Sequence, residues 1–316
     1  MKSKIFLVLS LLLGLFFAKS VSALTLNNDG TYTNGKNAIL TFDQYLKLSS
    51  VYHDKTIDQF SQSVIDGLSE YNQIIPQDQY AITTELIDNA GNVVSSITIP
   101  ATEAEALAVT VNNNLHVLAD GQLHNISSNE LISINGYVND WNYSTKSKKI
   151  RLTYNAINYG SEYVIATEAE WLKTPNTKSV DVLAVRWESS LSTSAPIDYE
   201  AYQETDVGTT YYSLGGTNMV RGNYGIGESM NLVDSASDFL LSMVIVMPNS
   251  VGDQVYATYQ HATTGVLLST SKSYTFGSSG LGGVLVYNPS YYASYYDNMN
   301  GVTDTLASGC HFDWCA

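Results

Sequence analysis

The second half of this chain contains a regular succession of short β-rich runs, and this pattern constrains the fold more than any other feature of the sequence. From residue 148 to residue 292 the runs recur at intervals of roughly ten to fifteen residues, with turn-forming residues between them, which is typical of antiparallel sheets. The run DFLLSMVIVM at 238–247 is apolar on both faces, as expected for a central strand that is covered on both sides. We therefore predict a mainly β protein, an antiparallel β-sandwich of jelly-roll-like or immunoglobulin-like type at residues 148–295, with an interior filled by apolar side chains.

Near the start of the chain, the spacing of apolar residues is typical of helices and not of strands. Within residues 24–75, the stretch 24–38 reads as an irregular or short-hairpin start, and over 40–72 apolar side chains recur at a spacing near 3.6, which predicts two or three short helices. Thr41 with Gln44, and Thr56 with Gln59, have the spacing of capping boxes at helix starts. This segment is predicted to be a small helical element, with a partner-binding helical hairpin as the alternative.

Two further segments complete the predicted organisation. Residues 76–147 are expected to form a small β-rich or irregular region, in which YAITTELIDNAGNVVSSITI reads as a hairpin with its turn at DNAGN. Residues 296–316 are expected to form a C-terminal tail.

The first 23 residues have the pattern of a secretion signal. Lys2 and Lys4 precede an apolar run, and the small residues Val21, Ser22 and Ala23 end the segment. The apolar run is about fourteen residues long, short of the roughly twenty that span a bilayer, so a cleaved signal is favoured over a membrane anchor. We predict a secreted, extracellular protein with no membrane span after cleavage.

The charge of the chain argues against some partners. The formal charge is −15 and falls to −18 when residues 1–23, which contain three lysines and no acid, are removed. Binding to phosphate backbones or anionic lipid depends on lysine and arginine, so this acidity argues against nucleic acid as a partner.

Glu168 and Glu170 are weak candidates for catalytic carboxylates. In a strand, residues two apart project from the same face with Cα atoms about 6.5–7 Å apart, which overlaps the carboxylate separations used in glycoside hydrolysis. The same pattern is common on the solvent face of antiparallel strands, and that interpretation is favoured.

The five histidines form no recognisable catalytic or metal motif; they are His53, His116, His124, His261 and His311. No serine lies in a Gly-x-Ser-x-Gly elbow, and no His-Glu-x-x-His helix is present. His261 is expected at a strand end, capping a sheet edge. No cofactor is predicted.

Tyrosines gather in YNPSYYASYYDNMNG, where Tyr291, Tyr292, Tyr295 and Tyr296 are weak candidates for ligand contact. Exposed tyrosines can stack on sugar rings or anchor a protein interface, whereas buried ones would close the sandwich. Packing is the favoured interpretation.

The two cysteines, Cys310 and Cys315, lie in the terminal GCHFDWCA. Outside the cell two thiols this close tend to oxidise, and four intervening residues are enough to close a ring. A disulfide is predicted; a metal site with His311 and Asp313 is disfavoured because adjacent ligands would have to converge on one ion.

Three stretches resemble a group of secreted proteins of Gram-positive bacteria that have no assigned function. They are LTFDQYLKLSSVYHDKTIDQF, EAEWLKTPNTKSVDVLAVRW and YATYQHATTGVLLSTSKSYTFGSSGLGGVLVY, with YYDNMNGV following the last. The resemblance implies export from a Gram-positive cell and implies no activity.

Together these features favour a secreted, non-catalytic protein that binds a glycan or a protein at or near the cell surface. A glycan-acting hydrolase using Glu168 and Glu170 is the first alternative, and a β-rich secreted toxin is the second.

Overall fold

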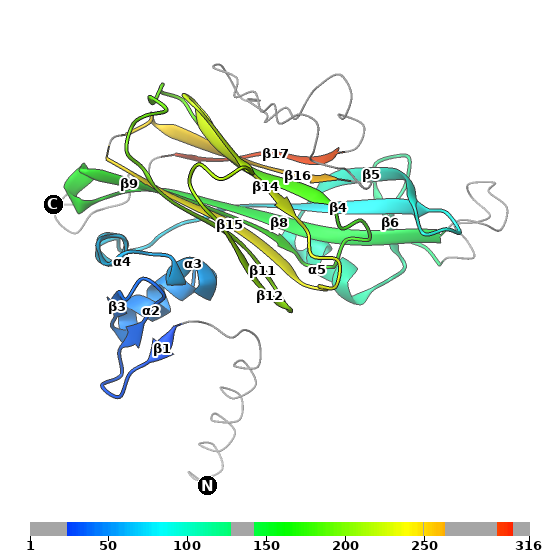
Figure 1. The fold of residues 1–316 in the computed structure, drawn as a ribbon. Helices are drawn as coiled ribbons and strands as arrows, with labels where there is room; N and C mark the ends of the chain where they lie inside the picture. Colours follow the sequence, from blue (N-terminus) through cyan, green and yellow to red (C-terminus); the bar gives the residue numbers. More distant parts are fainter. Residues whose placement is uncertain (1–23, 128–141, 249, 263–295, 306–316) are drawn as a thin grey trace, which may run out of the picture. The chain divides into compact units, whose positions relative to one another are not determined.

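The computed structural model describes residues 24–127, 142–248, 250–262 and 296–305 (Figure 1). The predicted signal segment, Cys310 and Cys315 lie outside these residues, as do Tyr291, Tyr292 and Tyr295. The chain divides into two units, Met1–Ile65 and Asp66–Ala316. No helix in the described ranges has the length and apolar character needed to cross a membrane.

The first unit contains a small sheet and short helices. Strands β1 (Thr25–Leu26), β2 (Tyr32–Thr33) and β3 (Ile39–Leu40) pair in sequence order, and α2 (Phe42–Ser49) and α3 (Asp54–Asp58) follow. Helix α4 (Gln62–Ser69) begins in this unit. The prediction of two or three short helices is confirmed.

One of the two predicted capping boxes is present. Thr41 and Gln44 cap α2 reciprocally, because each side chain accepts a hydrogen bond from the other residue's backbone N–H. The box predicted at Thr56 is wrong, because α3 begins at Asp54 and His53 caps it instead. The ring nitrogen Nδ1 of His53 accepts from the backbone N–H of Lys55 at 3.3 Å.

The second unit is an antiparallel β-sandwich. In its described part, one sheet has seven strands in the order β12-β11-β15-β9-β8-β4-β5. Their bounds are β4 Gln77–Ile87, β5 Val93–Ala101, β8 Asn142–Ile157, β9 Glu162–Trp171, β11 Asp198–Thr205, β12 Gly208–Tyr212 and β15 Phe239–Met247. The other sheet has five strands in the order β13-β14-β10-β16-β17. Their bounds are β10 Val180–Trp187, β13 Met219–Gly222, β14 Gly225–Asn231, β16 Gln254–Ala262 and β17 Tyr296–Thr305.

The core lies between these two sheets. Alternate residues of β8, β9 and β15 meet alternate residues of β10 and β16 in one cluster that contains Trp187, Tyr154 and Phe239 among its largest members. Strand β15 is buried along almost its whole length between β11 and β9, which confirms the central strand predicted at 238–247. The predicted mainly β sandwich is therefore the observed fold class.

The sandwich extends beyond the predicted range of 148–295. Strands β4 and β5 are the predicted hairpin, but they belong to the seven-stranded sheet, because β4 pairs with β8 along its length. At the other end of the chain, β17 continues the five-stranded sheet beside β16. Hydrophobic periodicity identifies single strands but does not reveal which distant strands pair, so the boundaries were misplaced.

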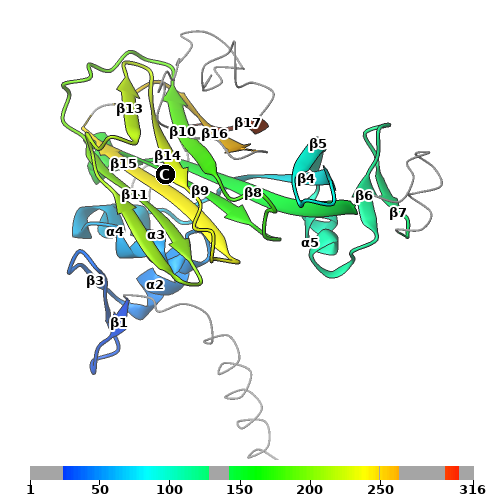
Figure 2. The same cartoon turned by 45° about the vertical axis from the view of Figure 1, so that its right-hand side comes forward.

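A small layer covers the outer face of the seven-stranded sheet near β4 and β8 (Figure 2). Helix α5 (Glu103–Val111) and the hairpin of β6 (Leu115–Val117) and β7 (Leu123–Asn125) form it. Val109 of α5 and Val117 of β6 pack on Ile82 of β4, away from the main core. This layer holds the second group of buried polar residues described below.

Candidate functional site

Polar side chains replace apolar ones at one end of the inter-sheet interior. We call this group the buried polar cluster; its members are Glu85, Lys148, Trp171, Asp181, Tyr259 and His261. Lys148, Asp181 and His261 are 0% exposed, and Glu85 is 1% exposed. The prediction of a wholly apolar interior is therefore wrong at this end of the sandwich.

The period of the strands places these side chains inside. In β10, Asp181 shares the inner face with Leu183, Val185 and Trp187. In β16, Tyr259 and His261 continue the inner face begun by Val255 and Ala257, and in β8 Lys148 precedes inward-facing Ile150. Each polar residue thus occupies the position at which its strand would otherwise contribute another apolar side chain.

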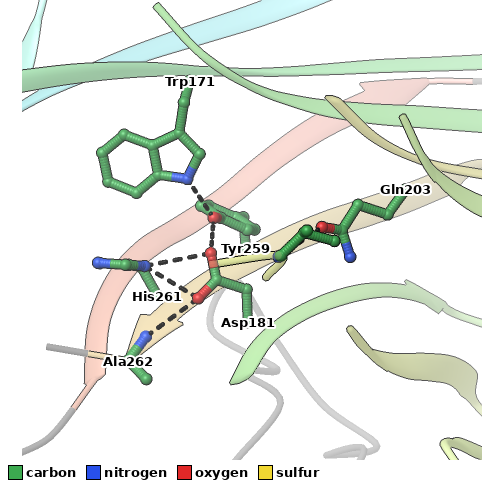
Figure 3. Close-up of polar contacts among 7 residues, drawn as sticks. Trp171, Asp181, Gln203, Tyr259, His261 and Ala262 are labelled. Carbon is green, nitrogen blue, oxygen red and sulfur yellow. Dashed lines mark hydrogen bonds and ion pairs between the residues drawn. The ribbon is translucent and has the colours of Figure 1, made fainter. Parts of the chain in front are cut away.

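The carboxylate of Asp181 is the centre of the cluster (Figure 3). It accepts a short hydrogen bond from the hydroxyl of Tyr259, which in turn accepts from Nε1 of Trp171 at 2.7 Å. Nδ1 of His261 lies 2.9 and 3.1 Å from its two oxygens, and the backbone N–H of Ala262 donates to it at 3.3 Å. An ionised carboxylate only accepts, so with Asp181 ionised the hydrogen bond to His261 is donated by Nδ1.

Lys148 and Glu85 complete the cluster from β8 and β4. The ammonium group of Lys148 is 5.1 Å from the centre of the Trp171 ring and 5.8 Å from that of Tyr259, within the range of cation–π attraction. Glu85 accepts from Nδ2 of Asn176 at 2.6 Å. Burial raises the pKa of Glu85, while the charge of His261, the hydrogen bond from Asn176 and the charges of nearby lysines oppose that shift.

An Asp–His pair beside a tyrosine has the groups needed for proton transfer, but here they are closed to solvent. A general base must lie within hydrogen-bond reach of its substrate, and the described side chains leave these groups essentially no exposed surface. Nε2 of His261, the ring nitrogen that faces away from Asp181, is buried and has no hydrogen-bond partner among the described residues. In the described part of the structure the cluster is therefore a set of interior contacts that presents no group to solvent.

The placement of His261 corrects a prediction. It was expected to cap a sheet edge, but β16 lies between β10 and β17, so the side chain is in the interior. In the sequence, the only sign that His261 lies inside is its position on the same face of β16 as the apolar residues before it. The partner of His261, Asp181, is eighty residues away and could not be inferred from spacing.

A second polar network lies under the outer layer. The hydroxyls of Thr84 and Thr145 are 2.9 Å apart, and Nδ1 of His116 is 2.9 Å from the Thr145 hydroxyl. Thr84 also accepts from the backbone N–H of Val117 at 2.6 Å. Burial, and secondarily the charge of Lys173, lowers the pKa of His116 below its usual 6.5.

We therefore expect His116 to make stability depend on pH. Well above pH 6.5 the side chain is neutral in both states; as the pH falls through 6.5, the unfolded chain binds the proton first. The free energy of unfolding should therefore decrease as the pH falls from 6.5 through the lower pKa of the folded state. Urea unfolding at about pH 7.5, 6.5 and 5.5 measures this decrease, and the His116→Gln variant should lose part of it. An identical pH dependence in the variant would contradict the assignment.

Glu168 and Glu170 share one face of β9, on the side away from the core residues Ala169 and Trp171. Glu168 is 8% exposed and lies opposite Arg151 in the β8–β9 register, and Glu170 lies opposite Lys149. Arg151 donates two hydrogen bonds of 2.7 Å to Asp78, and these bonds, with the charges of Asp78 and Glu168, raise the pKa of Arg151. The two glutamates thus lie in a cross-strand pattern of opposite charges, and a catalytic role for them stays a hypothesis.

The remaining candidate residues are distributed apart. His124 lies 2.8 Å from Asp120 on the exposed β6–β7 hairpin. The predicted tyrosine contacts and the predicted Cys310–Cys315 disulfide concern side chains outside the described part of the structure. Within that part, no group of three histidine, cysteine or acidic side chains is arranged to hold a metal ion.

The surface feature that sequence reasoning missed is the β5 edge of the seven-stranded sheet. Among the described strands β5 pairs with β4 alone, and it is the last strand of its sheet. Its sequence, VVSSITIPA, contains no charged residue, and Val94 and Ile97 are 44% and 37% exposed. Natural edge strands are commonly protected by charges, by proline or by a covering segment; β5 has no charge and one proline, Pro100, and no described strand pairs with its outer side.

Comparisons with known proteins show no family for this chain. No family model matches it, and no curated protein matches it significantly. A collagen-binding domain from a Staphylococcus aureus adhesin is 10% identical, with 49% of this chain and 94% of that chain covered and a TM-score of 0.25. The serine-rich repeat adhesion glycoprotein Srr1 from Streptococcus agalactiae is 8% identical, with 63% and 86% covered and a TM-score of 0.23. These scores are too low for the likeness to assign a function.

Proposed function

We propose that this chain is a secreted, non-catalytic protein that binds a protein at or near the cell surface. The observation that carries the proposal is the open β5 edge, an uncharged strand whose exposed side chains include Val94 and Ile97. A strand edge binds through backbone groups, and backbone groups in an extended conformation are what another polypeptide offers. This favours a protein over a glycan as the target.

Two further observations support a binding role over a catalytic one. The described cluster of groups suited to proton transfer, centred on Asp181 and His261, is closed to solvent. Glu168 and Glu170, the hydrolase candidates, lie opposite Arg151 and Lys149 in the sheet register. A toxin role has no specific support in the described residues.

Binding to intact cells tests the proposal. The purified protein, labelled with a fluorophore, should bind saturably to cells of a Gram-positive bacterium or to animal cells. Treatment of the cells with protease should remove most of the binding, whereas treatment with glycosidases should not. A glycan array probed with the same protein is the matched control. Saturable binding to glycans that survives protease treatment would contradict the protein target.

A hydrolase assay tests the alternative. Release of reducing ends from cell-wall polysaccharide should be no greater with the wild-type protein than with the Glu168→Gln and Glu170→Gln double variant. Release that disappears in the double variant would show that the chain is a hydrolase.

A further inference from the structure

The β5 edge, the surface on which the proposed function depends, has properties that define the kind of segment it would accept. Its open side, the small apolar layer beside it and the charges at its two ends can each be read from the structure.

The backbone of β5 is regular enough to pair on its outer side. The register with β4 has no irregularity from Ser95 to Ala101, and the shift occurs only between Leu86 and Ile87 of β4. Proline in a sheet is confined to positions whose N–H would face away from the ladder, so Pro100 identifies the outward-facing set of residues. By the alternation of an antiparallel pair, the N–H and C=O groups of Thr98 and Ser96 face outward as well.

Side chains beside the edge favour an apolar partner. On one face of β5, Ile99 packs against Ile82, Val109 and Val117 of the small outer cluster, and Ile97 on the same face is 37% exposed. A strand added beside β5 would place every second side chain next to this face. An apolar residue there would extend the existing cluster and remove Ile97 from water.

Charges at both ends of β5 favour a basic partner. Asp88 begins the β4–β5 turn, and its carboxylate accepts from the backbone N–H groups of Ala90 and Asn92. Beyond the other end, Glu103 and Glu105 lie exposed in the first turn of α5. Inward from β5, the cations of β8 are two strands away: Lys146 and Lys148 lie opposite Thr83 and Ala81 of β4, and Lys149 and Arg151 contact Asp78. An uncharged strand is thus bounded by carboxylates on both sides.

The same charges argue against a second copy of this chain as the occupant. If two β5 strands paired antiparallel, Asp88 of one copy would approach Glu103 of the other, and parallel pairing would bring identical acids together. Like charges placed opposite each other destabilise strand pairing. The net charge of −15 adds a general repulsion between copies.

We propose that the β5 edge binds an extended segment of a partner protein by strand addition, and that this segment is uncharged and alternately apolar in its centre with lysine or arginine at both ends. The inference rests on the proposed function and names the binding site and partner chemistry for it. Backbone hydrogen bonds along Ser96 and Thr98 give the affinity, and the apolar alternation and the terminal cations give the specificity.

A synthetic peptide tests this directly. The probe has an alternation of valine and threonine over about seven residues, with two lysines at each end, and its control has two glutamates at each end instead. Binding of the labelled peptides to the purified protein is measured by fluorescence anisotropy at low and at high salt. The lysine-ended peptide should bind more tightly than the glutamate-ended one, with a difference that shrinks at high salt because surface charges are screened.

Variants of the protein locate the site. Ser96→Pro removes one outward N–H while leaving the ladder to β4 intact, and should weaken the lysine-ended peptide by about tenfold through the lost hydrogen bond and the displaced strand. Ser96→Thr is the matched control and should bind normally. Asp88→Asn combined with Glu103→Gln should weaken binding by about threefold to tenfold at low salt only.

The peptide itself supplies a second test, so that a poorly folded Ser96→Pro protein does not decide the outcome. N-methylation of every second backbone nitrogen of the probe, on the register that faces β5, should abolish binding, whereas methylation of the other register should not. Strand addition is overturned if both methylated peptides bind alike, if Ser96→Pro binds like wild type, or if the glutamate-ended peptide binds equally well. Concentration-dependent dimerisation that Ser96→Pro abolishes would replace the partner segment with a second copy.

The cell-binding assay separates this inference from the proposed function. Cell binding that is retained in Ser96→Pro would overturn the β5 site and leave the proposed function standing. Peptide binding that depends on Ser96, without any protein-dependent binding to cells, would support strand addition and overturn the proposed function.

Discussion

Replacement of Asp181 by alanine is expected to lower the free energy of unfolding by about 3–5 kcal/mol, because each buried donor left without its acceptor typically costs about 1–3 kcal/mol. The carboxylate accepts hydrogen bonds from Tyr259, His261 and the backbone of Ala262, all at the buried end of the sandwich. Without it, these donors remain buried and lose their acceptor. Urea unfolding of the two proteins at pH 7 measures the difference.

The control for this prediction is Asp181→Asn. The amide has nearly the shape of the carboxylate and keeps one accepting oxygen, so it should retain part of the network and lose less stability than alanine. A loss below about 1 kcal/mol for Asp181→Ala would contradict the prediction, because it would show that the hydrogen bonds of this buried carboxylate contribute little to the stability of the fold.

Replacement of Trp187 by alanine is expected to cost about 3–5 kcal/mol for a different reason, the cavity left by a large side chain in a packed core. Trp187 is 0% exposed and belongs to the core cluster of both sheets. Its Nε1 also donates to the backbone carbonyl of Asn223 at 2.9 Å, which ties β10 to the turn before β14. Thermal and urea unfolding should both show the loss.

Trp187→Phe separates the cavity from the hydrogen bond. Phenylalanine fills much of the space but cannot donate to Asn223, so we expect a loss of about 1–2 kcal/mol. Equal destabilisation by the alanine and phenylalanine variants would mean that the hydrogen bond, and not packing, dominates at this position.

Local patterns in the sequence predicted local structure well. The hairpin of β4 and β5 was predicted from two β-rich runs joined by DNAGN, and its turn forms at Asp88 as expected. The doubly apolar run at 238–247 predicted the buried strand β15. These features depend on residues close in sequence, whose propensity and period are visible without knowing what they pack against.

The candidate site was not predictable in the same way. Asp181, at the start of the alternating run of β10, gives no local sign that it lies inside, and its partner His261 is contributed by a strand eighty residues later. The alternation of residues along a strand shows which side chains share a face, but it does not show whether another part of the protein packs on that face. For the same reason β5 could be predicted as a strand but not as the edge of a seven-stranded sheet.

The sequence by itself determined the fold class, the strand periods and the short helices of this protein, because these follow from side chains a few residues apart. Only the tertiary structure decided which strands are neighbours, and with that the burial of Asp181 beside His261 and the exposure of β5. The physical reason is that pairing and burial depend on contacts between residues far apart in sequence, for which spacing along the chain has no signature.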